Sequence, residues 1–140
     1  MRTTLRAGLT STLDYVVPQS RTVPSLLPES PPFSRMPRVL ATGYLVGLVE
    51  WTCMELLQPH LDGDERTLGT HIELSHESPT IPGAHLRLGA ELTEIEGRTL
   101  TFNVFAHDEY AQVCRGRHQR AVIDLARFVS KLRARHEDAT

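Results

Sequence analysis

The sequence predicts an α+β fold in which an antiparallel sheet wraps around one buried central helix. Two observations predict it. Residues 43–54 form an almost wholly apolar run of helical length, and residues 70–125 then carry apolar side chains at alternate positions, the period of a strand. A chain of 140 residues is long enough to bury about two-thirds of its unfolded surface around one core. We therefore expect residues 1–140 to form a single domain.

The first element is a strand over residues 11–17, ended by Pro18. Residues 18–37, the lid segment, contain six prolines, which exclude a regular helix or an interior strand. The lid segment also carries apolar side chains that need burial: Leu26, Leu27, Phe33 and Met36. A long, stiff loop of this kind is typical of a lid over a site, and a loop packed on the core would have the same composition.

The central helix covers residues 42–57 and stops before Pro59. Glu50 is the one carboxylate within its apolar run. Burying an ionised carboxylate costs several kcal/mol unless it is paired or its pKa rises. Such a group suits acid/base or nucleophilic chemistry, and a glutamate that reaches the edge of the protein is the equally weighted alternative.

Four strands follow the helix, and they are expected at residues 70–76, 85–94, 100–106 and 110–125, with a turn at 96–98 between the second and the third. The chain then ends in an amphipathic helix whose apolar face consists of Leu125, Phe128, Val129 and Leu132. Consecutive strands pair antiparallel, and the sheet must cover the apolar helix, which is the hot-dog arrangement. Because one such sheet seldom closes around its helix alone, we expect a homodimer.

Charge and cysteine content limit the possible partners. The net charge of −2, from 15 basic and 17 acidic side chains, provides no field that would recruit nucleic acid or a membrane. Cys53 and Cys114 have no short spacing, which favours a reducing cytoplasm over a disulfide framework. Residues 1–12 lack the apolar core of a signal peptide, and residues 43–54 are too few to span a bilayer. The seven histidines show no metal-type pairing, and the sequence has neither a Gly-rich phosphate loop nor a GxSxG motif.

Strand parity makes His76 a candidate for acid/base chemistry. It shares a face with Ile72 and Leu74, so it should point inward, toward the helix that carries Glu50. A histidine beside a carboxylate is a plausible charge-coupled pair, and a hydrogen-bonded core histidine is the alternative.

Thr42 lies where the helix N-cap is expected, and capping alone would explain it. Its hydroxyl could also face a substrate beside the unpaired N–H groups of the helix start. Thr42 and Glu50 are eight positions apart, roughly 12 Å along a helix axis. Either the chain bends at Gly43, or the two residues serve different ends of one elongated site, or a dimer mate supplies one of them.

Gly69 and Arg120 are further candidates. Gly69 precedes the inward-facing strand, where glycine allows a ligand to approach the backbone closely or eases a bulge. Arg120 shares strand parity with Val122, so it should point inward and needs an anion. The C-terminal third is locally basic and could receive a phosphorylated carrier or be a solvated surface; its cations are Arg115, Arg117, Arg127, Lys131, Arg133 and Arg135.

Several segments together resemble one known family, the fluoroacetyl-CoA thioesterases of the hot-dog fold. They are VVP (16–18), LLPESPPF (26–33), ATGYLVGLVEW (41–51), LGTHIELSH (68–76) and RHQRAVIDL (117–125). The resemblance extends from about Thr12 to Lys131. It implies hydrolysis of short acyl-CoA thioesters, with a link to fluoroacetate resistance.

The resemblance also implies roles for individual residues. The catalytic Thr, Glu and His of the family fall on Thr42, Glu50 and His76. The Gly and Arg near the α-substituent of the acyl group fall on Gly69 and Arg120. The aromatic gate falls on Phe33 and on Met36, where the fluoroacetyl enzyme has a second Phe, so we expect weaker fluorine selectivity.

We therefore expect a homodimeric, cytoplasmic acyl-CoA thioesterase that acts on fluoroacetyl-CoA or a near relative. Glu50 would attack the carbonyl or activate water, His76 would shuttle protons, and Thr42 would orient the acyl group. No metal or cofactor is expected beyond the coenzyme A of the substrate. Two rival functions share these residues: a non-catalytic acyl-CoA-binding module, and a hot-dog dehydratase that acts on 3-hydroxyacyl thioesters.

Overall fold

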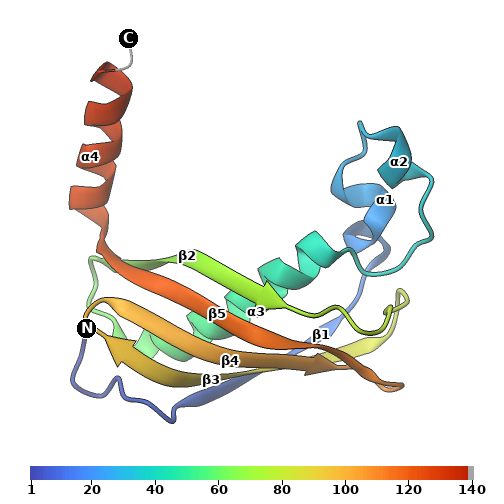
Figure 1. The fold of residues 1–140 in the computed structure, drawn as a ribbon, viewed down its shortest axis with the longest axis horizontal. Helices are drawn as coiled ribbons and strands as arrows, with labels where there is room; N and C mark the ends of the chain where they lie inside the picture. Colours follow the sequence, from blue (N-terminus) through green and yellow to red (C-terminus); the bar gives the residue numbers. More distant parts are fainter. Residues whose placement is uncertain (139–140) are drawn as a thin grey trace.

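The computed structural model describes residues 1–138 as a curled five-stranded antiparallel sheet with a long helix against one face (Figure 1). The strands are β1 (Thr10–Val16), β2 (Glu65–Leu74), β3 (His85–Glu96), β4 (Thr99–His107) and β5 (Gln112–Asp124). The longer helices are α3 (Thr42–Leu57) and α4 (Leu125–Asp138), and the single-turn helices are α1 (Val23–Leu26), α2 (Pro31–Ser34), η1 (Gln19–Arg21) and η2 (Gln58–His60). No helix among these residues is long and apolar enough to cross a membrane.

The strand order is β1-β3-β4-β5-β2, with every neighbouring pair antiparallel. Pairing of consecutive strands is confirmed for β3, β4 and β5, but the expectation that β2 pairs with β3 is wrong. β1 already occupies the free edge of β3, so β2 lies at the opposite edge of the sheet, beside β5. β1 and β2 are therefore the two edge strands.

The alternation read from the sequence matches the buried face of the sheet. The apolar residues of β3 and β4 on one parity are all buried: Leu86, Leu88, Ala90, Leu92, Leu100, Phe102, Val104 and Ala106. They form one core with the inward face of α3. Gly97 has a φ of +60°, which gives the predicted turn between β3 and β4 the left-handed conformation that glycine adopts at no steric cost.

Helix α3 has the predicted bounds and lies at the centre of the core, as expected for the hot-dog fold. One stripe along it remains exposed, because a single sheet covers only one side of a helix. This stripe contains Gly43, Gly47, Trp51 and Met54.

The lid segment contains three single-turn helices, η1, α1 and α2, so the expectation that its prolines exclude helix is wrong at this scale. Pro24, Pro31 and Pro32 lie in first turns, where a missing N–H removes no intrahelical bond. The lid segment packs on the start of α3. A Cβ added at Gly43 would lie 2.9 Å from Cδ2 of Leu26, so a larger residue here would require the Leu26 side chain to shift. In Figure 1 the lid segment and α4 project beyond the β2 edge of the sheet, at its opposite ends.

Candidate active site

Thr42 and His76 form the first cluster of candidate residues. The predicted N-cap role of Thr42 is wrong: Ala41 is the N-cap of α3, and its carbonyl accepts a hydrogen bond from the N–H of Leu45. Thr42 is the first helical residue, and its Oγ1 lies 2.8 Å from Nδ1 of His76, in a hydrogen bond. His76 lies two residues beyond the end of β2, so the edge strand delivers it to the N-terminal end of α3.

The imidazole of His76 is half-buried, and this burial lowers its pKa. Its Nε2 is buried and has no hydrogen-bond partner within residues 1–138. Buried polar atoms in native proteins are nearly always paired. The unpaired nitrogen beside Thr42 is therefore the atom at which we expect a ligand or a second chain to complete the site.

Glu50 and Arg120 form the second cluster. Arg120 points inward, as predicted, with only 3% of its side chain exposed, and the anion that it meets is Glu50. Nη1 of Arg120 donates to Oε2 of Glu50 at 2.9 Å, a charge-assisted hydrogen bond. Arg120 therefore holds the carboxylate at one oxygen. The Glu50 side chain is 37% exposed, so solvent or a ligand can still reach it.

Gly69 lies directly against this ion pair. It is opposite Arg120 in the register of β2 and β5, and the register shifts between Gly69 and His71. A Cβ at this position would lie 2.8 Å from Oε2 of Glu50 and 3.2 Å from Cε1 of His118. The irregular register agrees with the predicted bulge, and the space beside Gly69 is occupied by side chains of this chain; close approach of a ligand stays a prediction.

His118 was missed in the sequence analysis. It is buried on β5, and its Nε2 lies 3.1 Å from Nη1 of Arg120. The available signal was strand parity, because His118 lies two residues before Arg120 and shares its inward face. Glu50, Gly69, His118 and Arg120 are called the Glu50 cluster below.

The pair expected between Glu50 and His76 does not form within this chain. His76 is hydrogen-bonded to Thr42, and Glu50 to Arg120. Helix α3 runs without interruption from Thr42 to Leu57, so no bend at Gly43 brings the two clusters together. They lie at positions roughly 12 Å apart along the axis of α3.

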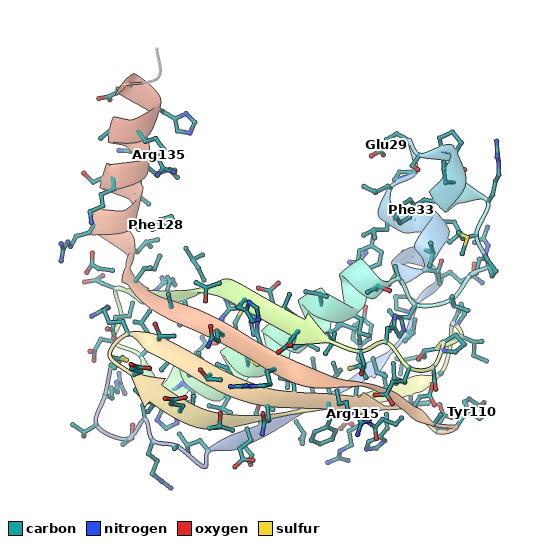
Figure 2. All side chains as sticks on the ribbon, in the orientation of Figure 1. Glu29, Phe33, Tyr110, Arg115, Phe128 and Arg135 are labelled. Atoms are coloured by element: carbon teal, nitrogen blue, oxygen red, sulfur yellow. The ribbon has the colours of Figure 1, made fainter. Side chains whose placement is uncertain are left out.

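The two residues predicted to form an aromatic gate lie on the lid segment. Phe33 is in α2 and half-buried, and Figure 2 shows it on the part that projects from the sheet. Met36 follows α2, and 50% of its surface is exposed. The lid segment adjoins the N-terminal end of α3 through Leu26 and Gly43, the end at which Thr42 meets His76.

The basic residues of α4 adjoin a groove at the other end of the sheet. The groove has a volume of about 610 Å³, and its charged lining includes Arg98, Arg127 and Lys131 together with Asp62 and Glu65. With Asp64 and Asp124, the acidic side chains of the lining outnumber the basic ones by four to three, so the groove carries no excess of positive charge. Figure 2 shows Phe128 and Arg135 on α4, which projects away from the sheet.

Comparison with known proteins identifies the family. Residues 22–126 match the sequence profile of the fluoroacetyl-CoA-specific thioesterases. A fluoroacetyl-CoA thioesterase of Streptantibioticus cattleyicolor is 44% identical over 133 residues, which cover 95% of this chain and 96% of that protein. The chain belongs to this family.

Solved structures of a fluoroacetyl-CoA thioesterase, FlK, have the same fold as this family member. One is 45% identical with a TM-score of 0.90, and the match covers 93% of this chain and 96% of that one. Another, a variant in complex with fluoroacetate and CoA, is 45% identical with a TM-score of 0.87, covering 89% and 99% of the two chains. A thioesterase superfamily member from Thermus thermophilus, 22% identical over 97% of this chain and 96% of its own, has a TM-score of 0.81 and supports the hot-dog fold alone.

Proposed function

We propose that the protein hydrolyses a short acyl-CoA thioester, with fluoroacetyl-CoA as the favoured substrate, to the free acid and CoA. The observation that carries this proposal is the partly exposed Glu50 side chain, whose Oε2 is anchored by Arg120 within the apolar run of α3. A carboxylate in a fixed orientation within reach of a ligand can act as a nucleophile or as a general base. Membership of the thioesterase family supports the same reaction.

In the proposed reaction, Glu50 attacks the acyl carbon or removes a proton from the water that attacks it. A new C–O bond forms, the C–S bond breaks, and the CoA thiolate takes up a proton. If Glu50 is the nucleophile, water then cleaves the resulting anhydride and restores the carboxylate. His76 is the proton carrier, because its half-buried imidazole has one nitrogen hydrogen-bonded to Thr42 and the other unpaired within residues 1–138. No cofactor takes part in these steps.

We further propose that the working site is composite and that the protein is a homodimer. The two clusters are too far apart on one helix to act on one acyl group, and β2 is an edge strand with an unpaired side. The apolar side chains of Leu68 and Ile72 are exposed on this strand. If β2 pairs antiparallel with β2 of a second copy, the His76 end of one strand would approach the Gly69 region of the other.

In this arrangement Thr42 and His76 of one protomer would meet Glu50, Gly69 and Arg120 of its partner. The acyl group would lie between the clusters, and the lid segment with Phe33 and Met36 would cover it.

A cytoplasmic location is part of the proposal. Both cysteines are free thiols, as expected in a reducing compartment, and burial raises the pKa of Cys53 to about 12 and that of Cys114 to about 11, so little reactive thiolate forms.

The reaction is tested by thiol release from acetyl-, fluoroacetyl- and 3-hydroxybutyryl-CoA, with identification of the acyl products. We expect free acid and CoA, with Glu50→Gln inactive and Glu55→Gln, an exposed glutamate of the same helix, active. Binding without thiol release would leave an acyl-CoA-binding module. Loss of water with the thioester intact would indicate a dehydratase.

The composite site is tested by mixing two inactive variants, Glu50→Gln and His76→Ala, under conditions that exchange subunits. A mixed dimer has one site with both residues intact if each site draws on two chains. Random exchange should then restore about a quarter of the wild-type activity. No restoration, in a mixture shown to contain mixed dimers, would mean that each chain works alone.

A further inference from the structure

His118 lies behind the Glu50–Arg120 ion pair, on the side away from solvent. Only 2% of its surface is exposed, and its ring stacks on Phe102 of β4 with 6.4 Å between the ring centroids and 29° between the planes. It is too deeply buried to touch a substrate that reaches Glu50, so any contribution to catalysis must pass through its neighbours.

The hydrogen-bond partners of His118 determine where its proton lies. Nδ1 is 2.7 Å from the backbone carbonyl of His71, which can only accept, so Nδ1 carries the hydrogen. Nε2 is 3.1 Å from Nη1 of Arg120, which can only donate, so Nε2 is an unprotonated acceptor. The ring is therefore neutral, in the Nδ1–H tautomer.

The same contact determines the orientation of the Arg120 guanidinium. Nε donates to Oγ1 of Thr67 at 2.8 Å, and Nη2 donates to the carbonyl of Thr67 at 2.9 Å. The two hydrogens of Nη1 are divided between Oε2 of Glu50 and Nε2 of His118. His118 is thus the acceptor that directs one Nη1 hydrogen away from Glu50 and the other toward it.

We propose that His118 is a positioning residue: as a neutral acceptor it orients Arg120 so that the guanidinium holds Glu50 through Oε2 and leaves Oε1 for the substrate. The inference rests on the hydrolysis proposed above. Thr67 fixes one edge of the guanidinium and His118 the other, so the arginine cannot turn to bind both carboxylate oxygens. Gly69 leaves the space in which these three side chains meet.

The electrostatic surroundings keep the ring neutral. Burial lowers the pKa of His118 and the charge of Arg120 lowers it further, while the hydrogen bond to the His71 carbonyl opposes both. The ionisable groups that face the ring are Arg120 on β5, His71 on β2 and Glu50 on α3. On β4 it meets the uncharged ring of Phe102. A second proton on Nε2 would face an N–H of Arg120 and break the contact.

Two variants separate positioning from packing. His118→Phe keeps a ring against Phe102 but removes the acceptor, whereas His118→Gln restores an acceptor near the position of Nε2. We expect kcat to fall on the order of 10- to 100-fold in His118→Phe, the cost of a misplaced reacting group, with KM little changed. His118→Gln should recover most of that loss, and His136→Gln on α4 is the control for an exposed histidine. Wild-type kcat in His118→Phe, or equal impairment in both variants, would overturn the proposal.

Nitrogen-15 NMR tests the same inference without turnover. His118 of the wild-type protein should be in the neutral Nδ1–H form at pH 8, and the Nε–H of Arg120 should exchange more rapidly in His118→Phe than in the wild type. An Nε2–H tautomer, or unchanged exchange at Arg120, would overturn the role of His118. Absence of thiol release by the wild-type protein would instead overturn the proposed function, and the Arg120 exchange rates would still decide whether His118 orients the guanidinium.

Discussion

Gly69→Ala should impair turnover much more than folding. An alanine Cβ would lie 2.8 Å from Oε2 of Glu50, about 0.6 Å closer than the 3.4 Å at which ordinary contact begins. It would also lie 3.2 Å from Cε1 of His118 and 3.5 Å from Nη1 of Arg120, so the new methyl group meets three members of one hydrogen-bonded cluster.

The size of the effect follows from which atoms can move. The contacts are with side-chain atoms, and the Glu50 side chain is 37% exposed whereas that of Arg120 is 3% exposed, so Glu50 should shift by about half an ångström or more and loosen its bond to Arg120. Overpacking of this kind costs about 1–3 kcal/mol of stability. A displacement of this order at a reacting group is expected to lower kcat on the order of 10- to 100-fold.

The assay is thiol release from fluoroacetyl-CoA at saturating substrate, combined with thermal unfolding. Gly63→Ala is the matched control, because a Cβ at Gly63 meets nothing within 4 Å. A Gly69→Ala protein with the kcat of the wild type would refute the assignment of the Glu50 cluster to the reaction. A fall in kcat that Gly63→Ala reproduces would refute the steric argument.

Three further predictions concern the remaining site residues. Glu50→Gln should lower turnover by about 100- to 10,000-fold, and adding His76→Ala should cost little more, because parts of one catalytic unit are not additive; fully multiplicative losses in kcat would separate the two residues. Met36→Phe should increase the preference for fluoroacetyl- over acetyl-CoA, since a rigid ring covers the acyl group more completely than flexible methionine, and an unchanged ratio of kcat/KM would locate selectivity elsewhere. Neutralising Arg127 and Lys131 should raise KM in a salt-dependent manner if they meet the CoA phosphates, and a KM independent of salt would exclude that contact.

The predictable parts of the fold are those in which each element has one buried face. β3 and β4 alternate strictly because one side of each packs on α3, and their inward residues could be named from the sequence. The bounds of α3 were equally plain, since its apolar run ends just before Pro59. These signals are local, and the sequence displays them directly.

The position of β2 was not predictable in this way. Most of its residues are exposed in the single chain, so its alternation carries little information about which face is inward. Its partner is decided by competition for strand edges: β1, from the other end of the sequence, pairs with β3 and leaves β2 the edge of β5. Such a choice depends on contacts between distant segments, which hydrophobic periodicity does not encode.

Dependence on contacts between distant segments also explains why the predicted pairing of His76 with Glu50 is wrong. Inward parity correctly directs Arg120 toward α3, but it cannot say which turn of the helix the side chain meets. For His76 the parity argument is wrong, because β2 ends at Leu74 and Ile72, on the same parity, is exposed. β2 and β5 are antiparallel, and His76 lies beyond the end of β2 while Arg120 lies opposite Gly69 within it. His76 therefore reaches the first residue of α3, and Arg120 reaches Glu50, two turns farther along.

The pairing of Arg120 with Glu50 changes the role expected of Arg120. The family resemblance assigns an arginine at this position to the α-substituent of the acyl group, yet the Arg120 side chain is 3% exposed, and its Nη1 hydrogens are directed to Glu50 and His118. With so little of its side chain exposed, Arg120 offers a substrate little direct contact. Arg120 thus influences the acyl group chiefly through the position of Glu50. Selectivity for a small fluorinated group then depends on how rigidly this carboxylate is held, as well as on the lid that covers it.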